Sequence, residues 1–286
     1  MKYAFIQEQV YHHTVMALCS ALKVSRSGYY SWRTREPSQR AIDNQTVVKS
    51  IAEIHDETLQ SYGSPRMHVE LVEAGHDLSV GRVERLMSNN NLAAKQGKKN
   101  KQRQQHRNSM APVANVLDRQ FTAASPNTKW VSDITFIETR EGFLYLAVIL
   151  DLYSRVIVGW SMSHKIDEVL VQDALTMAVD RREIPNGLLL HSDQGSQYKA
   201  KGYQQRIKNL SIICSMSRKG ECHDNAVAES FFHSLKTELI CEHVYQNRSV
   251  ARQEIFKYIE IFYNRKRRHS TLNYQAPLTF ETMNAA

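Results

Sequence analysis

The spacing of apolar residues divides the chain into a helical first part and a strand-rich second part. Near the N-terminus four apolar residues recur at i, i+3, i+4 and i+7, which is the spacing of one helical face. These residues are Val15, Leu18, Cys19 and Leu22. A turn at residues 24–25 follows, and Ser25 is of a type that caps helices. The pattern predicts two short helices joined by a turn.

This layout is typical of a helix-turn-helix, whose second helix would present Arg26, Ser27 and Tyr30 to a DNA groove. A plain helical hairpin fits the same spacing equally well. A further helical block follows up to residue 94, broken at the Y-G-S-P-R stretch and again at Gly75. We expect a three-helix unit there, with Ser79 capping its last helix.

After residue 125 the spacing becomes strand-like. Short segments rich in β-branched and aromatic residues predict three adjacent strands at 130–137, 143–150 and 155–160. A helix opened by Asp167, a strand at 188–190, a further helix, a strand at 211–216, and a long helix from Asn225 to about Leu239 complete the series. This order predicts an α/β, ribonuclease-H-like catalytic domain, a mixed sheet flanked by helices, preceded by an all-α helix-turn-helix-like region.

Five segments are expected along the 286 residues. They are a helix-turn-helix-like segment at 1–40, a helical HTH-like domain at 41–94, a basic linker at 95–120, a catalytic core at 121–242, and a C-terminal helix with a basic tail at 243–286. A chain of this length fits two or three domains.

The charge balance favours a polyanionic partner. The chain carries a formal net charge of +8 and has a pI near 9.3. Residues 95–107 contain six Lys or Arg and no acidic or apolar residue, so this stretch cannot bury a core. We expect it to contact DNA phosphates through Lys98, Lys99, Lys101 and Arg103. A solvated tether without contacts is the alternative.

Cysteine use and hydropathy indicate a reducing, non-membrane location. The four cysteines include no C-x-x-C pair, and the longest apolar run, residues 143–150, has the length of a strand. We expect free thiols, no membrane contact, no signal peptide and a cytoplasmic protein. His12, His13 and Cys19 lack a second cysteine pair, and no zinc site is expected.

Three carboxylates stand in distinctive surroundings. They are Asp133 in W-V-S-D-I-T, Asp193 in H-S-D-Q-G-S-Q-Y and Glu229 in D-N-A-V-A-E-S-F. Hard oxygen ligands suit magnesium or manganese, and two such ions can clamp the attacking and leaving oxygens of a phosphodiester displacement. At 100° per residue Asn225, Glu229 and Lys236 share one side of the last core helix. A merely solvated helix face suits Glu229 and Lys236 equally well.

These motifs, together with S-R-K-G-E-C-H-D-N-A-V-A-E-S-F-F and Y-N-R-K-R-R-H-S-T-L, cover nearly the whole chain in order. The chain resembles a DDE transposase of the retroviral-integrase superfamily, and in particular an OrfB-type transposase of the IS-three family of bacterial insertion sequences. The resemblance implies metal-dependent DNA cleavage and strand transfer at the terminal inverted repeats, that is, DNA transposition, integration and recombination by a polynucleotidyl transferase in the bacterial cytoplasm.

The resemblance also implies residue roles. Asp133, Asp193 and Glu229 would be catalytic and hold two Mg²⁺ ions, with Mn²⁺ able to substitute. Lys236 would touch the DNA backbone near the scissile phosphate, and Asn225 would orient Glu229 or the strand. Implied partners are the insertion-sequence ends, target DNA, further copies of the chain, and an OrfA-type partner or frameshift fusion.

A run of four cations closes the last motif. It comprises Arg265, Lys266, Arg267 and Arg268. Consecutive charges disfavour burial and suit phosphates, so we expect all four to be exposed and to contact DNA. A solvated basic face is the competing interpretation. Two rival functions remain open at this point: a nuclease of the same fold that cuts without joining, and a non-catalytic regulator that only occupies the repeats.

Overall fold

The computed structural model describes residues 1–96, 113–218, 220–241 and 243–284. The chain divides into two compact units, residues 1–50 and 51–286. Among the described residues, no helix combines the length and apolar character needed to cross a membrane. The boundaries of the five expected segments stay a prediction.

The first unit is built on three short helices: α1 (Lys2–Gln9), α2 (Val15–Ala21) and α3 (Arg26–Arg33). Its small core is made of Ile6, Leu18, Cys19 and Tyr29. The Ser25 hydroxyl accepts a hydrogen bond from the Gly28 backbone at 3.0 Å, which confirms the expected cap. The two helices and turn predicted from apolar spacing are therefore confirmed. Helix α1 was not predicted.

Helix α4 (Gln39–Glu57) crosses the division between the units. In the second unit α5 (Ser64–Glu73) begins with Pro65 in its first turn, and α6 (Val80–Asn89) follows a turn at Gly75, whose φ is +88°. The predicted helices on either side of Gly75 are thus present. Helix α6 does begin after Ser79, but the Ser79 side chain makes no capping hydrogen bond.

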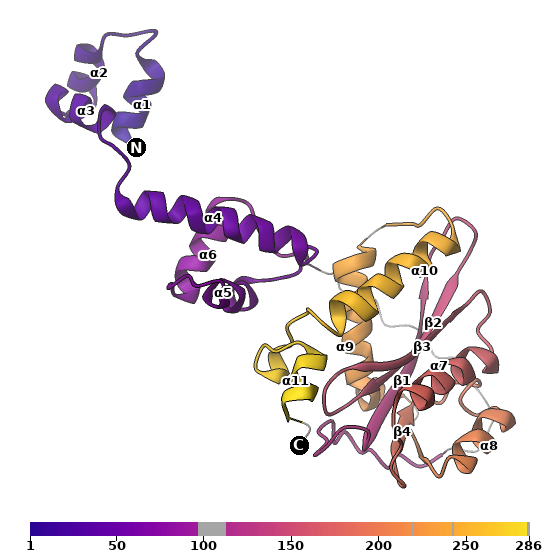
Figure 1. Cartoon of the computed structure of the whole chain (residues 1–286). Helices are drawn as coiled ribbons and strands as arrows, with labels where there is room; N and C mark the ends of the chain where they lie inside the picture. The colour runs from indigo at the N-terminus through magenta and orange to yellow at the C-terminus, as the bar shows by residue number, and fades with distance from the viewer. Residues whose placement is uncertain (97–112, 219, 242, 285–286) are drawn as a thin grey trace. The chain divides into compact units, whose positions relative to one another are not determined.

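The rest of the second unit is organised around a five-stranded sheet of order β3-β2-β1-β4-β5 (Figure 1). The strands are β1 (Lys129–Ile137), β2 (Leu144–Asp151), β3 (Ile157–Ser163), β4 (Leu189–Ser192) and β5 (Ile213–Met216). Strand β2 runs antiparallel to β1 and β3, whereas β4 runs parallel to β1 and β5. This mixed sheet confirms the ribonuclease-H-like class.

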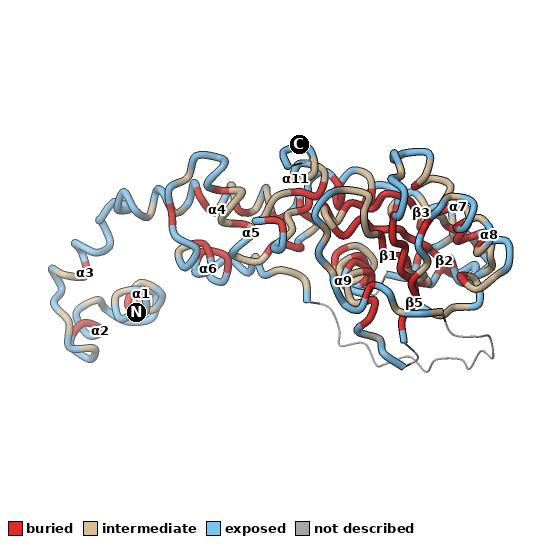
Figure 2. Tube along the Cα trace, turned by 90° about the horizontal axis from the view of Figure 1, so that it is seen from below, coloured by how far each residue is buried: buried red, intermediate tan, exposed pale blue. Residues whose placement is uncertain are grey.

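Helices cover both faces of the sheet. On one face α7 (Glu168–Arg181) and α8 (Lys201–Asn209) pack in a core with Trp130, Ile149 and Val158. The Asp167 side chain caps α7 by accepting from the Leu170 backbone at 3.2 Å, as expected. Alternate strand residues such as Val131 and Val148 are also fully buried. They face the other side, where α9 (Ala226–Leu235) contacts β1 (Figures 1 and 2).

The long helix expected from Asn225 to Leu239 is more irregular than predicted. A 3-10 turn, η1 (Cys222–Asn225), precedes α9, and a π-helical segment, η2 (Lys236–Ile240), continues it. After it come α10 (Arg248–Phe256), a second π segment, η3 (Lys257–Tyr263), a 3-10 turn, η4 (Ser270–Leu272), and α11 (Pro277–Asn284). π segments often occur at functional sites because they re-aim side chains.

Candidate active site

Strand pairing places Asp133 and Asp193 side by side. Strands β1 and β4 are parallel neighbours, with Val131 opposite His191. Asp133 lies two residues beyond Val131, and Asp193 lies two residues beyond His191, directly after the end of β4. Side chains two residues apart point to the same face. The register therefore brings both carboxylates to one place, as the motifs predicted.

Glu229 reaches this place from α9. The Asn225 side-chain amide, next to the start of α9, donates a hydrogen bond of 3.0 Å to the Ser132 carbonyl, the residue before Asp133. Asn225 is only 4% exposed. This bond ties the first turn of the helix to β1, and Glu229 follows one turn later. Asn225 is thus bonded to the strand rather than open to DNA, which supports the orienting role and not a phosphate contact.

The electrostatics of Asp133 reflect the charges of the other two acids. Desolvation raises the pKa of Asp133 well above its ordinary range, and the negative charges of Asp193 and Glu229 raise it further. The Ile134 backbone N–H, which donates to Asp133 at 2.8 Å, opposes this shift. Desolvation also raises the pKa of Asp193 and of Glu229. A concentration of negative charge of this kind favours a bound cation.

Lys236 stands beside the acids. Its ammonium group lies 5.1 Å from the centre of the Phe136 ring on β1, and its positive charge lowers the pKa of Asp133. Lys236 is the first residue of η2, so it projects from the point where α9 changes to π geometry. The expected grouping of Lys236 with Glu229 on one side of this helix agrees with these interactions.

The acids do not form a closed metal cage. In the described part of the chain, no three His, Cys, Asp or Glu side chains are close enough together to hold one ion. Asp193 and Glu229 are exposed, whereas Asp133 is half-buried. Asp193 accepts a 2.9 Å hydrogen bond from the Gly195 backbone, which fixes its carboxylate at the turn. The Glu229 side chain is exposed on α9.

The surrounding motif residues have structural roles. Trp130 is fully buried and donates to Asp151 through its indole N–H at 3.2 Å. His191 is fully buried, its ring lies within hydrogen-bonding distance of the Ser215 and Ser217 hydroxyls, and burial lowers its pKa to about 4. Both side chains pack and form hydrogen bonds inside the fold.

The run of four cations is divided between surface and interior. Arg265 and Lys266 are exposed, but Arg267 is 4% exposed and bonded to Glu238. The expectation that all four cations are exposed is therefore wrong. Consecutive side chains point in different directions, and the buried Glu238 carboxylate accepts hydrogen bonds from the Arg267 guanidinium.

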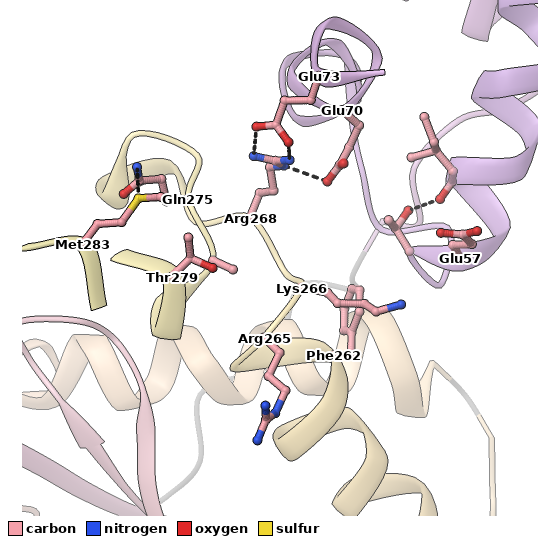
Figure 3. A pocket seen from close by; sticks show the side chains of 13 residues that line it. Glu57, Glu70, Glu73, Phe262, Arg265, Lys266, Arg268, Gln275, Thr279 and Met283 are labelled. Carbon is pink, nitrogen blue, oxygen red and sulfur yellow. Dashed lines mark hydrogen bonds and ion pairs between the residues drawn. The ribbon is translucent and has the colours of Figure 1, made fainter. Parts of the chain in front are cut away.

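Arg268 is also occupied by carboxylates. Its guanidinium donates to Glu70 at 2.7 Å and to Glu73 at 2.5 Å, both on α5. These residues border a pocket of about 500 Å³ formed by the ends of α4 and α5 and the segment 262–283 (Figure 3). In Figure 3 Arg265 points away from Arg268, so the two arginines do not form one basic surface.

The remaining predicted contacts lie on α3 and in the basic linker. On α3, Arg26 and Ser27 are exposed and Tyr30 is 45% exposed, as a groove-facing helix requires. The four cations predicted in the linker lie outside the described residues; they are Lys98, Lys99, Lys101 and Arg103. Cys19, Cys214 and Cys241 are free thiols.

Sequence reasoning missed a set of charges that supports the site. Asp224 is fully buried and accepts hydrogen bonds from Asn115, Arg119 and Arg218. Together these bonds hold the turn before α9 against residues 115–119. The only signal in the sequence was the D-N-A element, for which a role was predicted at Asn225 but not at Asp224.

Matches to family models define the class of the protein. Residues 123–222 and 210–277 match two models described as "Integrase core domain", and residues 42–100 match one described as "HTH-like domain". These matches fall on the sheet with its acids and on the helical block before it. The chain therefore has the integrase core of a polynucleotidyl transferase.

Relatives narrow the class to a family. The chain is 40% identical over 288 aligned positions to "Transposase InsF for insertion sequence IS3A" of Escherichia coli (strain K12), covering 100% of both chains. It is also 40% identical to "Insertion element IS600 uncharacterized 31 kDa protein" of Shigella sonnei, covering 92% of this chain and 97% of the relative. The chain belongs to the family of IS3-type insertion-sequence transposases.

Solved structures of retroviral integrases also match. The catalytic core of HTLV-2 integrase, solved in complex with magnesium, has a TM-score of 0.43 at 15% identity and covers 55% of this chain and 98% of its own. The catalytic core of BIV integrase has a TM-score of 0.41 at 17% identity, covering 55% of this chain and 95% of its own.

Proposed function

We propose that this chain cuts and joins DNA strands at the terminal inverted repeats of an insertion sequence, using Asp133, Asp193 and Glu229. The observation that carries the proposal is the parallel register of β1 and β4, in which Val131 lies opposite His191, each two residues before one of the aspartates. The bond from Asn225 to Ser132 brings the helix of Glu229 to the same strand. Family membership supports the reaction class, and the geometry supports the residues.

The donor set fits magnesium. All three side chains offer hard oxygen ligands. Burial raises the pKa of Asp133, the negative charges of Asp193 and Glu229 raise it further, and a bound cation would offset these effects. Asp133, Asp193 and Glu229 would hold two Mg²⁺ ions, or Mn²⁺ in their place, once the exposed Glu229 side chain turns toward the aspartates. Bound there, the ions would activate water or a 3′-hydroxyl and stabilise the leaving oxygen.

The chain's own residues position the DNA. Lys236, beside Asp133, supplies a positive charge for a phosphate next to the acids. Arg26 on α3, Arg265, Lys266 and the basic linker add phosphate contacts, which fix register without reading sequence. Further copies of the chain on the DNA ends and an OrfA-type partner belong to the proposal on family grounds alone.

The first prediction is that Asp193→Asn abolishes nicking while leaving DNA affinity within about twofold. Asparagine keeps the size of the side chain but removes the negative charge that a divalent cation needs. The measurement uses a labelled duplex that carries the terminal repeat found beside this coding sequence, with nicking read on gels and binding read without Mg²⁺. Asp173→Asn, an exposed acid on α7, is the matched control and should nick normally.

Equal loss of nicking and binding in Asp193→Asn would refute the ligand role. The same assay separates the rival functions. If the wild type cuts but never uses a 3′-hydroxyl DNA end as the nucleophile, the protein is a nuclease. If it binds the repeats and nicks nothing with Mg²⁺ or Mn²⁺, it is a regulator. Joined products distinguish a transposase from both.

A further inference from the structure

A buried ion pair lies behind the catalytic helix. The Arg267 Nε atom donates to both carboxylate oxygens of Glu238, at 3.0 and 2.8 Å, and its Nη2 atom donates to Glu238 Oε1 at 2.6 Å. The two side chains are only 5% and 6% exposed. Glu238 belongs to η2, the π segment that continues α9. Arg267 is therefore attached to the helix that carries Glu229 and Lys236.

The contacts of this pair span three segments. Arg267 Nη2 also donates to the Ser234 hydroxyl on α9 at 3.1 Å, and the Tyr258 hydroxyl on η3 donates to Glu238 at 2.7 Å. The guanidinium lies 5.5 Å from the centre of the Tyr263 ring. Arg267 thus grips two positions one turn apart on the helix while its own segment is fixed to η3. Such a geometry constrains both the rotation and the sliding of the helix.

The gripped side is the back of the helix. Ser234 follows Glu229 by five residues within α9, which places it on the far side at about 100° per residue. Glu238, four residues further on in η2, is bonded to the same guanidinium. Lys236 follows Glu229 by seven residues and returns to the near side, where it meets Phe136 and acts on Asp133. A rotation of the helix would therefore move Glu229 and Lys236 together relative to Asp133.

We propose that Arg267 is a positioning residue: by holding Ser234 and Glu238 it sets the rotation of α9 and η2, and so the placement of Glu229 and Lys236 against Asp133. The inference rests on the proposed function of those residues. A buried ion pair adds little net stability over apolar side chains of similar size, but it is directional, and apolar contacts are not. A directional contact can fix the rotation of a helix that carries a catalytic acid.

The test compares Arg267→Lys with Arg182→Lys. Lysine keeps the charge of Arg267 but loses the planar fork that holds both oxygens of Glu238. Arg182 makes a partly buried ion pair with Glu281, and neither residue lies on an element that carries the three acids. On the terminal-repeat duplex we expect Arg267→Lys to cleave about 10- to 100-fold more slowly at saturating DNA, with affinity within about twofold of wild type. Arg182→Lys should cleave like wild type.

A second measurement does not depend on cleavage. Hydrogen exchange of the amides in residues 226–240 should be faster in Arg267→Lys than in wild type, and unchanged in Arg182→Lys. A double variant, Glu238→Leu with Arg267→Met, replaces the pair by apolar groups. It should recover wild-type melting temperature while still cleaving slowly, because apolar packing does not fix rotation.

Each outcome of these measurements either supports or overturns the positioning role of Arg267. Wild-type cleavage by a folded Arg267→Lys, or by a stable double variant, would overturn the positioning role. Loss of affinity with full cleavage at saturating DNA would make Arg267 a phosphate contact instead. If the wild type itself does not cleave, the proposed function fails. The exchange data still show whether Arg267 orders the helix, and unchanged exchange there overturns the inference by itself.

Discussion

At the scale of single residues, the molecule holds two aspartates in opposite electrostatic states within one region. Asp133 lies among other acids, and its pKa is raised. Asp224 is fully buried among donors, and the Arg218 guanidinium holds its pKa well below the ordinary range. The first arrangement leaves negative charge for a cation to neutralise. The second satisfies the charge within the protein, so its contribution is to stability.

We predict that Asp224→Asn lowers the free energy of unfolding by about 2 kcal/mol at pH 7. The carboxylate accepts from Arg218 at 2.9 Å and from Arg119 at 2.7 Å, but these partners are 48% and 42% exposed, and solvent weakens both pairs. Urea unfolding at pH 7 measures the change. Asp118→Asn, which removes an exposed partner of Arg218 at 3.4 Å, should cost less than about 0.5 kcal/mol.

The pH dependence of this effect has a definite sign. The pKa of Asp224 is lower in the folded state than in the unfolded state, where an aspartate titrates near about 3.9. Its contribution is therefore complete above that value and is lost as the pH falls toward the folded-state pKa. The gap between wild type and Asp224→Asn should stay nearly constant down to about pH 4.5 and shrink as the pH falls below about 4. A gap that stays constant would exclude an ionised Asp224 as its cause.

The positions of candidate residues could be predicted where a motif contained side chains with a recognisable chemistry. Asp133 and Asp193 follow from their motifs, and the register of β1 and β4 agrees. The burial of Arg267 could not be predicted, because its partner Glu238 is 29 residues away in sequence and the residues on either side of Arg267 are also cations. A run of cations in the sequence shows only that the segment is basic. Which of these side chains is buried depends on the fold.

At the scale of elements, apolar spacing predicted the order of strands and helices in the core correctly. The runs of β-branched, aromatic and other apolar residues in β1 and β2 and the buried stripe of α7 are local patterns, so the sequence predicted them. The π segments η2 and η3 were not predicted. They contact each other through the Tyr258 hydroxyl and Glu238, a pairing that apolar spacing along the chain does not reveal.

Close packing of α7 on β3 gives a prediction at this scale. A Cβ added at Gly159 would lie 2.3 Å from the Ala174 carbonyl oxygen and 2.8 Å from the Ala178 Cβ. We expect Gly159→Ala to lower the free energy of unfolding by about 2–3 kcal/mol, because backbone must move. Gly81→Ala is the control: nothing lies within 4 Å of its added Cβ in α6, so it should stabilise by about 0.5–1 kcal/mol. A neutral Gly159→Ala in urea unfolding would contradict this packing.

At the scale of the whole molecule, the basic residues behind the net charge of +8 do not form one uniform surface for DNA. Arg267 and Arg268 neutralise Glu238, Glu70 and Glu73, so their charges serve the fold in this structure. Arg265 and Lys266 remain exposed, and the cations of residues 95–107 are surrounded by polar sequence. Long-range attraction of DNA therefore depends on a subset of the basic residues.

The salt dependence of DNA affinity measures that subset. Each phosphate contact contributes about 0.9 to the slope of log affinity against log salt. Joint replacement of Arg265 and Lys266 by Ala should lower the slope by about 1–2, and replacement of four linker cations, Lys98, Lys99, Lys101 and Arg103, by about 3–4. Arg267→Lys should leave the slope unchanged, because that guanidinium is bonded to Glu238. Unchanged slopes in both alanine sets would place those residues in solvent, since counterions are released only where a cation meets a phosphate.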